Sequence, residues 1–267
     1  MKRLRPLLGT LVEIEVEDLQ GAPAASAIDR AFAAVDLVHR LMSVHEPHSD
    51  ISRLNGTAWR QPVTVHPWTL TTLRWALLVH IATEGLFDCA VGHEVARHGL
   101  VAGCGFDAAE PGSLADLEIA ADGSVRFARR IALDFGGIAK GFAVDRAVAT
   151  LRAAGVRRAS VNAGGDLRVI GREPRPIYVR DPADRGVLRL AGLLANGAVA
   201  TSSTVATIDR TTRRPVCDGE AWSVVAPRCV VADALTKVVA QTGRIDAPWL
   251  ARFGAKVWTA SMLTAAA

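Results

Sequence analysis

Hydrophobic and polar residues alternate near the start of the chain, from Thr10 to Glu17. A period of two places the apolar side chains on one face and the glutamates on the other, which predicts a half-buried strand. A break at Gly21-Ala-Pro23 ends this strand. From Ala24 to Met42, apolar residues recur at the spacing of an amphipathic helix. The chain therefore opens with a strand that is followed by a long helix.

Both periods recur along the rest of the chain, without a regular β-α-β alternation. Helical spacing predicts further helices at Ser49–Asn55, Thr69–Glu84, Phe142–Ala154, Val231–Gln241 and Ala247–Phe253. Apolar or alternating runs predict strands at Ile131–Leu133, Ala159–Val161, Leu167–Ile170, Tyr178–Val179, Val199–Ala200, Trp222–Ala226 and Lys256–Thr259. The stretch 118–133 is typical of a hairpin that turns at Asp122-Gly123. This mixture favours an α+β fold, and because no long linker or repeat divides the chain, we expect one domain over residues 1–267.

Composition excludes some classes of function. The chain has 267 residues and a formal net charge of +4, and its Arg-Arg pairs are spread along it. A nucleic-acid-binding protein would need a clustered basic stripe, so we expect no nucleic-acid partner. An anionic ligand accounts for the modest basic excess equally well. The cysteines show no metal-type spacing, and we expect free buried thiols at Cys89, Cys104, Cys217 and Cys229.

The first residues look briefly like the start of a signal peptide, but their apolar run is short and Glu13 and Glu15 interrupt it. No segment has the length of a transmembrane helix. As written, the sequence predicts a cytoplasmic protein, and an exported one if a leader has been trimmed away.

Candidate chemistry centres on the stretch from Asp134 to Gly141, which reads Asp-Phe-Gly-Gly-Ile-Ala-Lys-Gly. It follows an apolar run and precedes a predicted helix, so its glycines let backbone N–H groups approach a ligand at a helix N-terminus. Unpaired N–H groups and the helix dipole both favour a phosphate there. Lys140 adds a point charge for the same phosphate. The alternative is a tight turn with a solvated lysine.

Several short segments then occur in an order and spacing that resemble the FAD:protein FMN transferase (ApbE-like) family. They are Leu8-Gly9-Thr10, Met42-Ser43, Ser49 to Asn55, Phe87 to Gly92, Val161 to Asp166, Ala200-Thr201-Ser202 and Val231 to Lys237. The resemblance covers about residues 7–243. It implies a T-fold-like α+β architecture, with a mostly antiparallel sheet flanked by helices. It also implies an enzyme that moves FMN from FAD to a Thr or Ser hydroxyl of an acceptor flavoprotein and releases AMP.

The resemblance implies roles for particular residues. Contacts to the flavin nucleotide would come from Leu8, His45, Phe87, Asp88, Asp134, Gly136 and Lys140. A magnesium ion would be held by the backbone carbonyl of Gly137 and the carboxylate of Asp233. Leu8 stands where the family usually has Met, and His45 where it usually has an aromatic residue.

The chain departs from the family pattern after Asp233. The family has a threonine one helical turn later, whereas this chain has Lys237, with Thr236 at the position before it. Two hypotheses stay open: Thr236 serves as the hydroxyl ligand, or the Lys237 ammonium pairs with Asp233 and partly replaces the metal, since a protonated lysine cannot ligate. Asp233 and Lys237 are the candidate catalytic residues.

A second departure lies in residues 203–218, where the family usually has a longer segment with a histidine. This leaves two alternatives to flavin transfer. One is an FAD pyrophosphatase that releases FMN and AMP from the same site, and the other is a non-catalytic flavin-binding protein. The pattern specifies neither the acceptor protein nor the oligomeric state.

Overall fold

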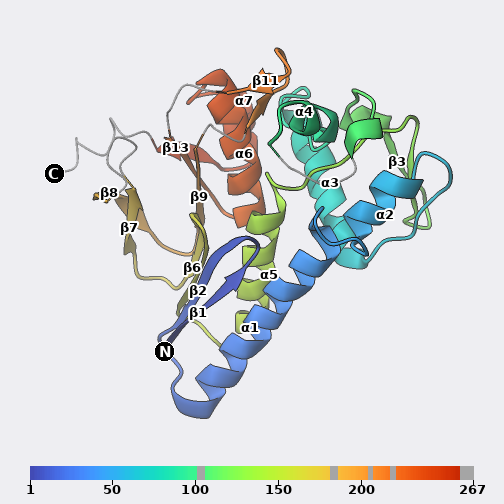
Figure 1. Ribbon diagram of the computed structural model, residues 1–267. Helices are drawn as coiled ribbons and strands as arrows, with labels where there is room; N and C mark the ends of the chain where they lie inside the picture. The colour runs from blue at the N-terminus through green and yellow to red at the C-terminus, as the bar shows by residue number, and fades with distance from the viewer. Residues whose placement is uncertain (101–105, 181–185, 204–206, 217–220, 259–267) are drawn as a thin grey trace.

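The centre of the protein is a seven-stranded sheet in the order β1-β2-β5-β6-β9-β12-β13. The computed structural model describes residues 1–100, 106–180, 186–203, 207–216 and 221–258 (Figure 1). Each neighbouring pair of strands in this sheet is antiparallel. The strands are β1 (Lys2–Leu7), β2 (Thr10–Val16), β5 (Ala159–Ala163), β6 (Asp166–Ile170), β9 (Ala198–Ser203), β12 (Ala221–Ala226) and β13 (Lys256–Trp258).

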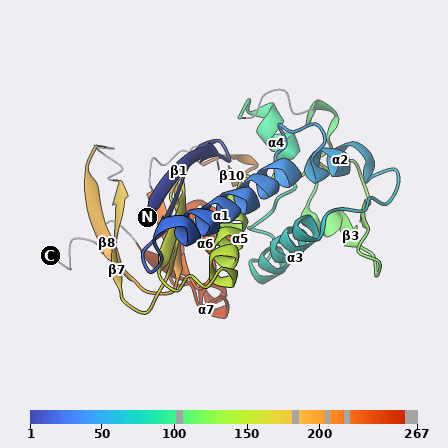
Figure 2. The ribbon, with the colours of Figure 1, turned by 90° about the horizontal axis from the view of Figure 1, so that it is seen from below.

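Three long helices cover one face of this sheet. They are α1 (Gly21–Met42), α5 (Ala139–Ala153) and α6 (Cys229–Thr242), and Figure 2 shows them side by side along the strands. The other face carries the ribbon of β7 (Arg175–Arg180) and β8 (Leu188–Leu194). Successive side chains of β9 point to opposite faces of the sheet, which accounts for both layers. Ala198 and Ala200 belong to the core beneath the helices, while Val199 packs with the ribbon. The expected α+β fold, with an antiparallel sheet flanked by helices, is confirmed.

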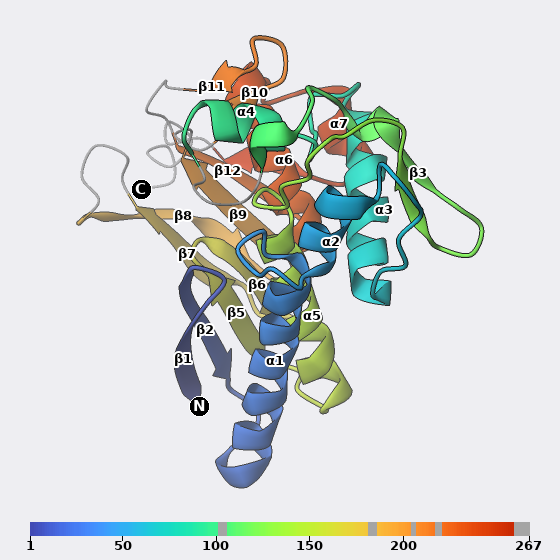
Figure 3. The same ribbon diagram turned by 45° about the vertical axis from the view of Figure 1, so that its right-hand side comes forward.

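The remaining elements lie beyond α1 and α6, away from the sheet (Figure 3). They include α2 (Asp50–Thr57), α3 (Pro67–Ala82), α4 (Gly92–Arg97) and the short helices Phe106–Ala108 and Leu114–Asp116, whereas α7 (Pro248–Arg252) lies between α6 and β13 in the chain. Two small ribbons, β3 (Leu117–Ile119) with β4 (Val125–Phe127) and β10 (Ile208–Asp209) with β11 (Arg214–Pro215), complete the described chain. None of the helices in the described ranges combines the length and the apolar character that a membrane-spanning helix needs.

The strand predicted at Ile131–Leu133 is wrong. These residues are buried, but they join no sheet. Their backbone groups find other partners: Asn55 exchanges two hydrogen bonds with Leu133, and the Gly92 N–H donates to the Ala132 carbonyl. Burial was therefore predicted correctly, but a side-chain amide replaces the strand ladder.

Most other predicted elements are present, with shifted ends. The helix expected from Phe142 begins at Ala139, and the helix expected from Val231 begins at Cys229. The strands β1 and β8 and the helix α4 were not predicted. Cys89 and Cys229 are free and buried as expected, whereas Cys104 and Cys217 lie outside the described residues.

Candidate functional site

A cavity of about 590 Å³ opens between the helical layer and the outer elements. Its walls come from distant parts of the chain: the Leu8-Gly9 turn, the end of α1, the segment 87–91, the loop 134–140, β9, β10 and α6. The volume lies in the range of about 300–1,000 Å³ that is typical of small-molecule and cofactor sites. Sequence segments far apart therefore meet around one space of suitable size.

The glycine loop forms one end of this cavity. The carboxylate of Asp134 turns back to accept the N–H of Gly136 at 2.7 Å, which shapes the turn before α5. Burial raises the pKa of Asp134, while the Gly136 hydrogen bond and the nearby His45, Lys140 and Lys237 act in the opposite direction. Asp134 is thus both a turn residue and a wall of the cavity.

The helix α5 begins beside this loop and packs closely on α6. Gly141 allows that approach, because a Cβ there would come within 2.3 Å of the Cys229 carbonyl oxygen. Its N–H donates to Asp233 Oδ2 at 3.0 Å. Asp233 therefore lies past the first turn of α6, which starts at Cys229, and its carboxylate faces α5. The helix expected from Val231 would have placed Asp233 in its first turn, and the earlier start of α6 makes that expectation wrong.

Lys140, in the first turn of α5, lies between two buried carboxylates. Its Nζ is 3.0 Å from Asp166 Oδ2 and 3.8 Å from Asp233 Oδ1. The charge of Asp233 is the main cause of a raised pKa at Lys140, so the ammonium stays charged. Burial, followed by the charge of Asp233, raises the pKa of Asp166 to about 6. Lys140 itself lines the cavity, so this pairing holds a positive charge at its surface.

Lys237 lies on the neighbouring wall, on α6. Its Nζ donates to Ser202 Oγ at 2.6 Å, and its methylenes cover Gly137, where a Cβ would come within 3.1 Å of Lys237 Cγ. Burial lowers the pKa of Lys237, and the charge of Asp233 opposes that shift. The ammonium that pairs directly with Asp233 is that of Lys140, which differs from the pairing with Lys237 considered from the sequence.

The residues implied for magnesium do not fit that ion. Asp233 Oδ2 accepts from Gly141 and Oδ1 faces Lys140, while the Thr236 hydroxyl donates to the Asp233 backbone carbonyl at 2.7 Å. The side chain of Lys237 covers Gly137. Across the described ranges, no three His, Cys, Asp or Glu side chains gather into a group that could hold a metal ion. Magnesium prefers several oxygen ligands, and here ammonium groups occupy the surroundings of the carboxylate.

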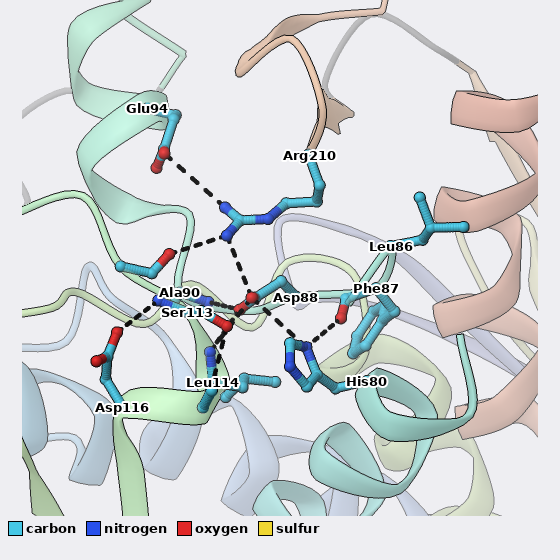
Figure 4. A network of polar contacts seen from close by, with 12 residues as sticks. His80, Leu86, Phe87, Asp88, Ala90, Glu94, Ser113, Leu114, Asp116 and Arg210 are labelled. Carbon is cyan, nitrogen blue, oxygen red and sulfur yellow. Dashed lines mark hydrogen bonds and ion pairs between the residues drawn. The ribbon is translucent and has the colours of Figure 1, made fainter. Parts of the chain in front are cut away.

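Another wall of the cavity is held by a network around Asp88 (Figure 4). Asp88 Oδ1 accepts the N–H groups of Ala90 and Leu114 at 2.8 and 3.1 Å. Its Oδ2 lies 3.2 Å from Arg210 Nη2 and 3.5 Å from His80 Nδ1. Asp88 lines the cavity, but its carboxylate oxygens are engaged in joining three pieces of the wall.

Arg210 follows strand β10, and its guanidinium is the centre of this network. It also donates to the Gly112 carbonyl at 2.9 Å, and its Nη1 lies 3.8 Å from Glu94 Oε1. No sequence pattern pointed to Arg210, because this residue lies in the segment that departs from the family pattern. The described part of that segment, residues 207–216, nevertheless contributes Thr207, Ile208 and Arg210 to the cavity.

Most of the predicted site residues meet at this cavity. The residues that line it are Leu8, His45, Phe87, Asp88, Asp134, Gly136, Gly137, Lys140 and Lys237. Asp233 and Thr236 are buried on α6 behind Lys140 and Lys237. Asp166 was missed as a site residue, although its turn, Gly164-Gly165-Asp166, belongs to the matched segments and could have pointed to it.

Comparison with known proteins agrees with this geometry. An FAD:protein FMN transferase from Rhodobacter capsulatus is 30% identical over 279 residues, covering 92% of this chain and 52% of that protein. One from Treponema pallidum is 27% identical over 63% of this chain and 51% of that protein. The chain thus spans about half the length of these curated relatives.

Solved structures show the same fold. The flavin transferase ApbE from Vibrio cholerae superposes with a TM-score of 0.80 at 21% identity, covering 99% of this chain and 98% of that one. The ApbE protein from Thermotoga maritima gives a TM-score of 0.79 at 23% identity, covering 92% and 88%. The sequence model of the ApbE family matches residues 8–258, and this chain therefore belongs to the ApbE family.

Proposed function

We propose that this chain binds FAD in the cavity and transfers its FMN half to a Thr or Ser hydroxyl of an acceptor protein, with release of AMP. One observation carries the proposal: the Lys140 ammonium lies at the cavity surface, in the first turn of α5, held by Asp166 and Asp233. A fixed cation at a helix N-terminus suits a pyrophosphate. The names of the curated relatives point to the same reaction.

The cavity also offers suitable surroundings for the rest of FAD. Phe87 and Leu8 supply apolar contacts for a ring system, and the exposed His45 at the rim can stack on one. Asp134 can accept a hydrogen bond from a ribose hydroxyl or the adenine amine. We assign the pyrophosphate to Lys140 and Lys237, because the N–H group of Gly136 already donates to Asp134.

The reaction would be a phosphoryl transfer between positioned oxygens. A bond forms between the acceptor hydroxyl oxygen and the FMN phosphorus, and the bond from that phosphorus to the bridging oxygen breaks. AMP leaves with that oxygen, and the hydroxyl proton passes to the departing AMP phosphate or to solvent. The cations neutralise charge that builds up on the phosphates. Asp233 lies behind Lys140, so we assign it to positioning that ammonium rather than to contact with the substrate.

We further propose that residues 1–267 act as one domain, because the cavity takes walls from Leu8 near one end of the chain and Lys237 near the other. The pyrophosphatase and the non-catalytic binding protein are the competing functions. The acceptor protein would be a flavoprotein that presents its hydroxyl at the cavity mouth.

The test is to incubate the purified protein with FAD and a threonine-containing acceptor peptide, with and without magnesium, and to weigh the products by mass spectrometry. The proposal expects a peptide that has gained FMN, together with AMP. FMN and AMP without a peptide adduct would establish the pyrophosphatase instead. Intact FAD that remains bound would establish a binding protein, and absence of FAD binding would overturn all three.

A further inference from the structure

Lys237 is the residue at which this chain differs most clearly from the magnesium site that its family resemblance implies. It stands at the position of a threonine ligand, and its side chain lies over Gly137, the residue whose carbonyl would be another ligand. The ammonium extends to Ser202 on β9 and lines the cavity. One side chain thus covers the place of two expected ligands.

The surrounding charges suit an ammonium there. Burial lowers the pKa of Lys237, the carboxylates of Asp233, Asp166 and Asp134 act in the opposite direction, and Lys140 adds to the lowering. These three carboxylates lie near two lysine side chains, so negative charge from the protein itself faces both lysines. Two lysines on adjacent walls can each meet an oxygen of a pyrophosphate, since an ammonium has three donors and accepts none.

We propose that Lys140 and Lys237 together replace the divalent cation in this chain, so that FAD binds through a pair of ammonium groups and needs no metal ion. This inference rests on the proposed function, since it concerns how the same cavity holds the FAD pyrophosphate. Lys237 would be a specificity-determining residue, because its ammonium, in the place of a metal ion, would contact the phosphate oxygens of the ligand.

The experiment measures FAD binding by flavin fluorescence in the presence of a chelator and in the presence of magnesium. Wild type is expected to bind FAD with the same affinity in both. Lys237→Met keeps the unbranched chain up to the position of Cε and removes the ammonium, and it should weaken FAD binding about tenfold or more, as for loss of a hydrogen bond to a charged group. Lys256→Met, at an exposed position of β13, is the matched control and should change nothing.

Lys237→Thr restores the residue that the family has at this position. In chelator it should bind FAD as weakly as Lys237→Met, and added magnesium should restore its affinity but not that of Lys237→Met. Thermal unfolding of each variant checks that it is folded, and the chelator titration of wild type decides the matter even if a variant is not.

The results separate this inference from the proposed function. A wild type that loses FAD in chelator and regains it with magnesium overturns the lysine pair but keeps the proposed function. Unchanged FAD affinity in a folded Lys237→Met also overturns the pair. Metal-independent binding without any transfer to an acceptor supports the pair and contradicts the transferase. No FAD binding by wild type under either condition overturns both.

Discussion

Two walls of the cavity each combine buried carboxylates with basic side chains, yet they are built differently. At Asp88, backbone N–H groups, a guanidinium and an imidazole surround the carboxylate, and Arg210 continues to a backbone carbonyl and Glu94. At Asp233, one oxygen accepts a single backbone N–H and the other faces an ammonium that lies at the cavity surface. The first group has its partners within the protein, whereas the second directs charge toward the cavity.

This difference indicates that one group of residues contributes mainly to stability and the other mainly to ligand binding. A buried ion pair whose partners are all internal costs most when one partner is removed, because an uncompensated charge is left behind. An ammonium at a cavity surface can form further hydrogen bonds with a ligand. We call the network of Asp88 and Arg210 the Asp88 wall, and the surface that carries Lys140 and Lys237 the lysine wall. We therefore infer that the Asp88 wall maintains the shape of the cavity and that the lysine wall recognises phosphate.

The largest effect is expected at the Asp88 wall. Asp88→Ala removes the nearer carboxylate from the guanidinium of Arg210, whose side chain is 9% exposed, and leaves only Glu94 at 3.8 Å. The free energy of unfolding should fall by about 3–5 kcal/mol, as for other broken buried pairs. Urea unfolding followed by circular dichroism measures it. A loss below about 1 kcal/mol, typical of surface pairs, would remove the contrast between the two walls.

A smaller effect is expected from the titration of Asp166 in the lysine wall. Its folded pKa of about 6 lies above the ordinary value, so the folded state binds the proton more tightly than the unfolded chain. The contribution to stability is therefore greatest at low pH and is lost as pH rises through about 6, by roughly 3 kcal/mol in total.

The measurement is the free energy of unfolding as a function of pH for wild type and Asp166→Asn, which keeps the shape of the side chain without titrating. The variant should show a flatter profile than wild type between pH values of about 4 and 7. If the two profiles run parallel, the carboxylate of Asp166 does not titrate as the geometry implies.

The smallest effect is expected at Arg213, at the rim of the Asp88 wall. Arg213 Nη1 lies 2.6 Å from Glu94 Oε1, but its side chain is 47% exposed. Solvent screens such pairs, so Arg213→Ala should cost at most about 1 kcal/mol and leave FAD affinity unchanged. Urea unfolding and the fluorescence titration with FAD test this prediction. A loss of unfolding free energy as large as that of Asp88→Ala would show that the exposed pair stabilises the protein as much as the buried pair does.

Local patterns predicted more of the lysine wall than of the Asp88 wall. The glycines, Asp134 and Lys140 stand within one short segment, so the loop and its position before a helix could be expected from the sequence. Arg210 pairs with Asp88 from 122 positions further along the chain, and it lies in the segment that departs from the family pattern. No local pattern indicates such a contact.

The roles of Asp166 and Ile131–Leu133 depended in the same way on tertiary contacts. The pKa of Asp166 follows from its burial beside Asp233 and Lys140, which no local pattern reveals. The apolar run at Ile131–Leu133 indicated burial correctly, but its backbone partner is Asn55, 78 positions away from Leu133.

The claim that the lysine wall recognises phosphate is tested most directly by comparing the affinities for FAD and for riboflavin, which lacks the phosphates. Both affinities are measured on wild type and on Lys140→Met. We expect wild type to prefer FAD, and Lys140→Met to weaken FAD binding by about 10- to 100-fold while riboflavin affinity stays the same, because only FAD brings phosphate oxygens to the ammonium. Unchanged FAD affinity, or an equal loss for both ligands, would contradict the claim that the lysine wall recognises phosphate.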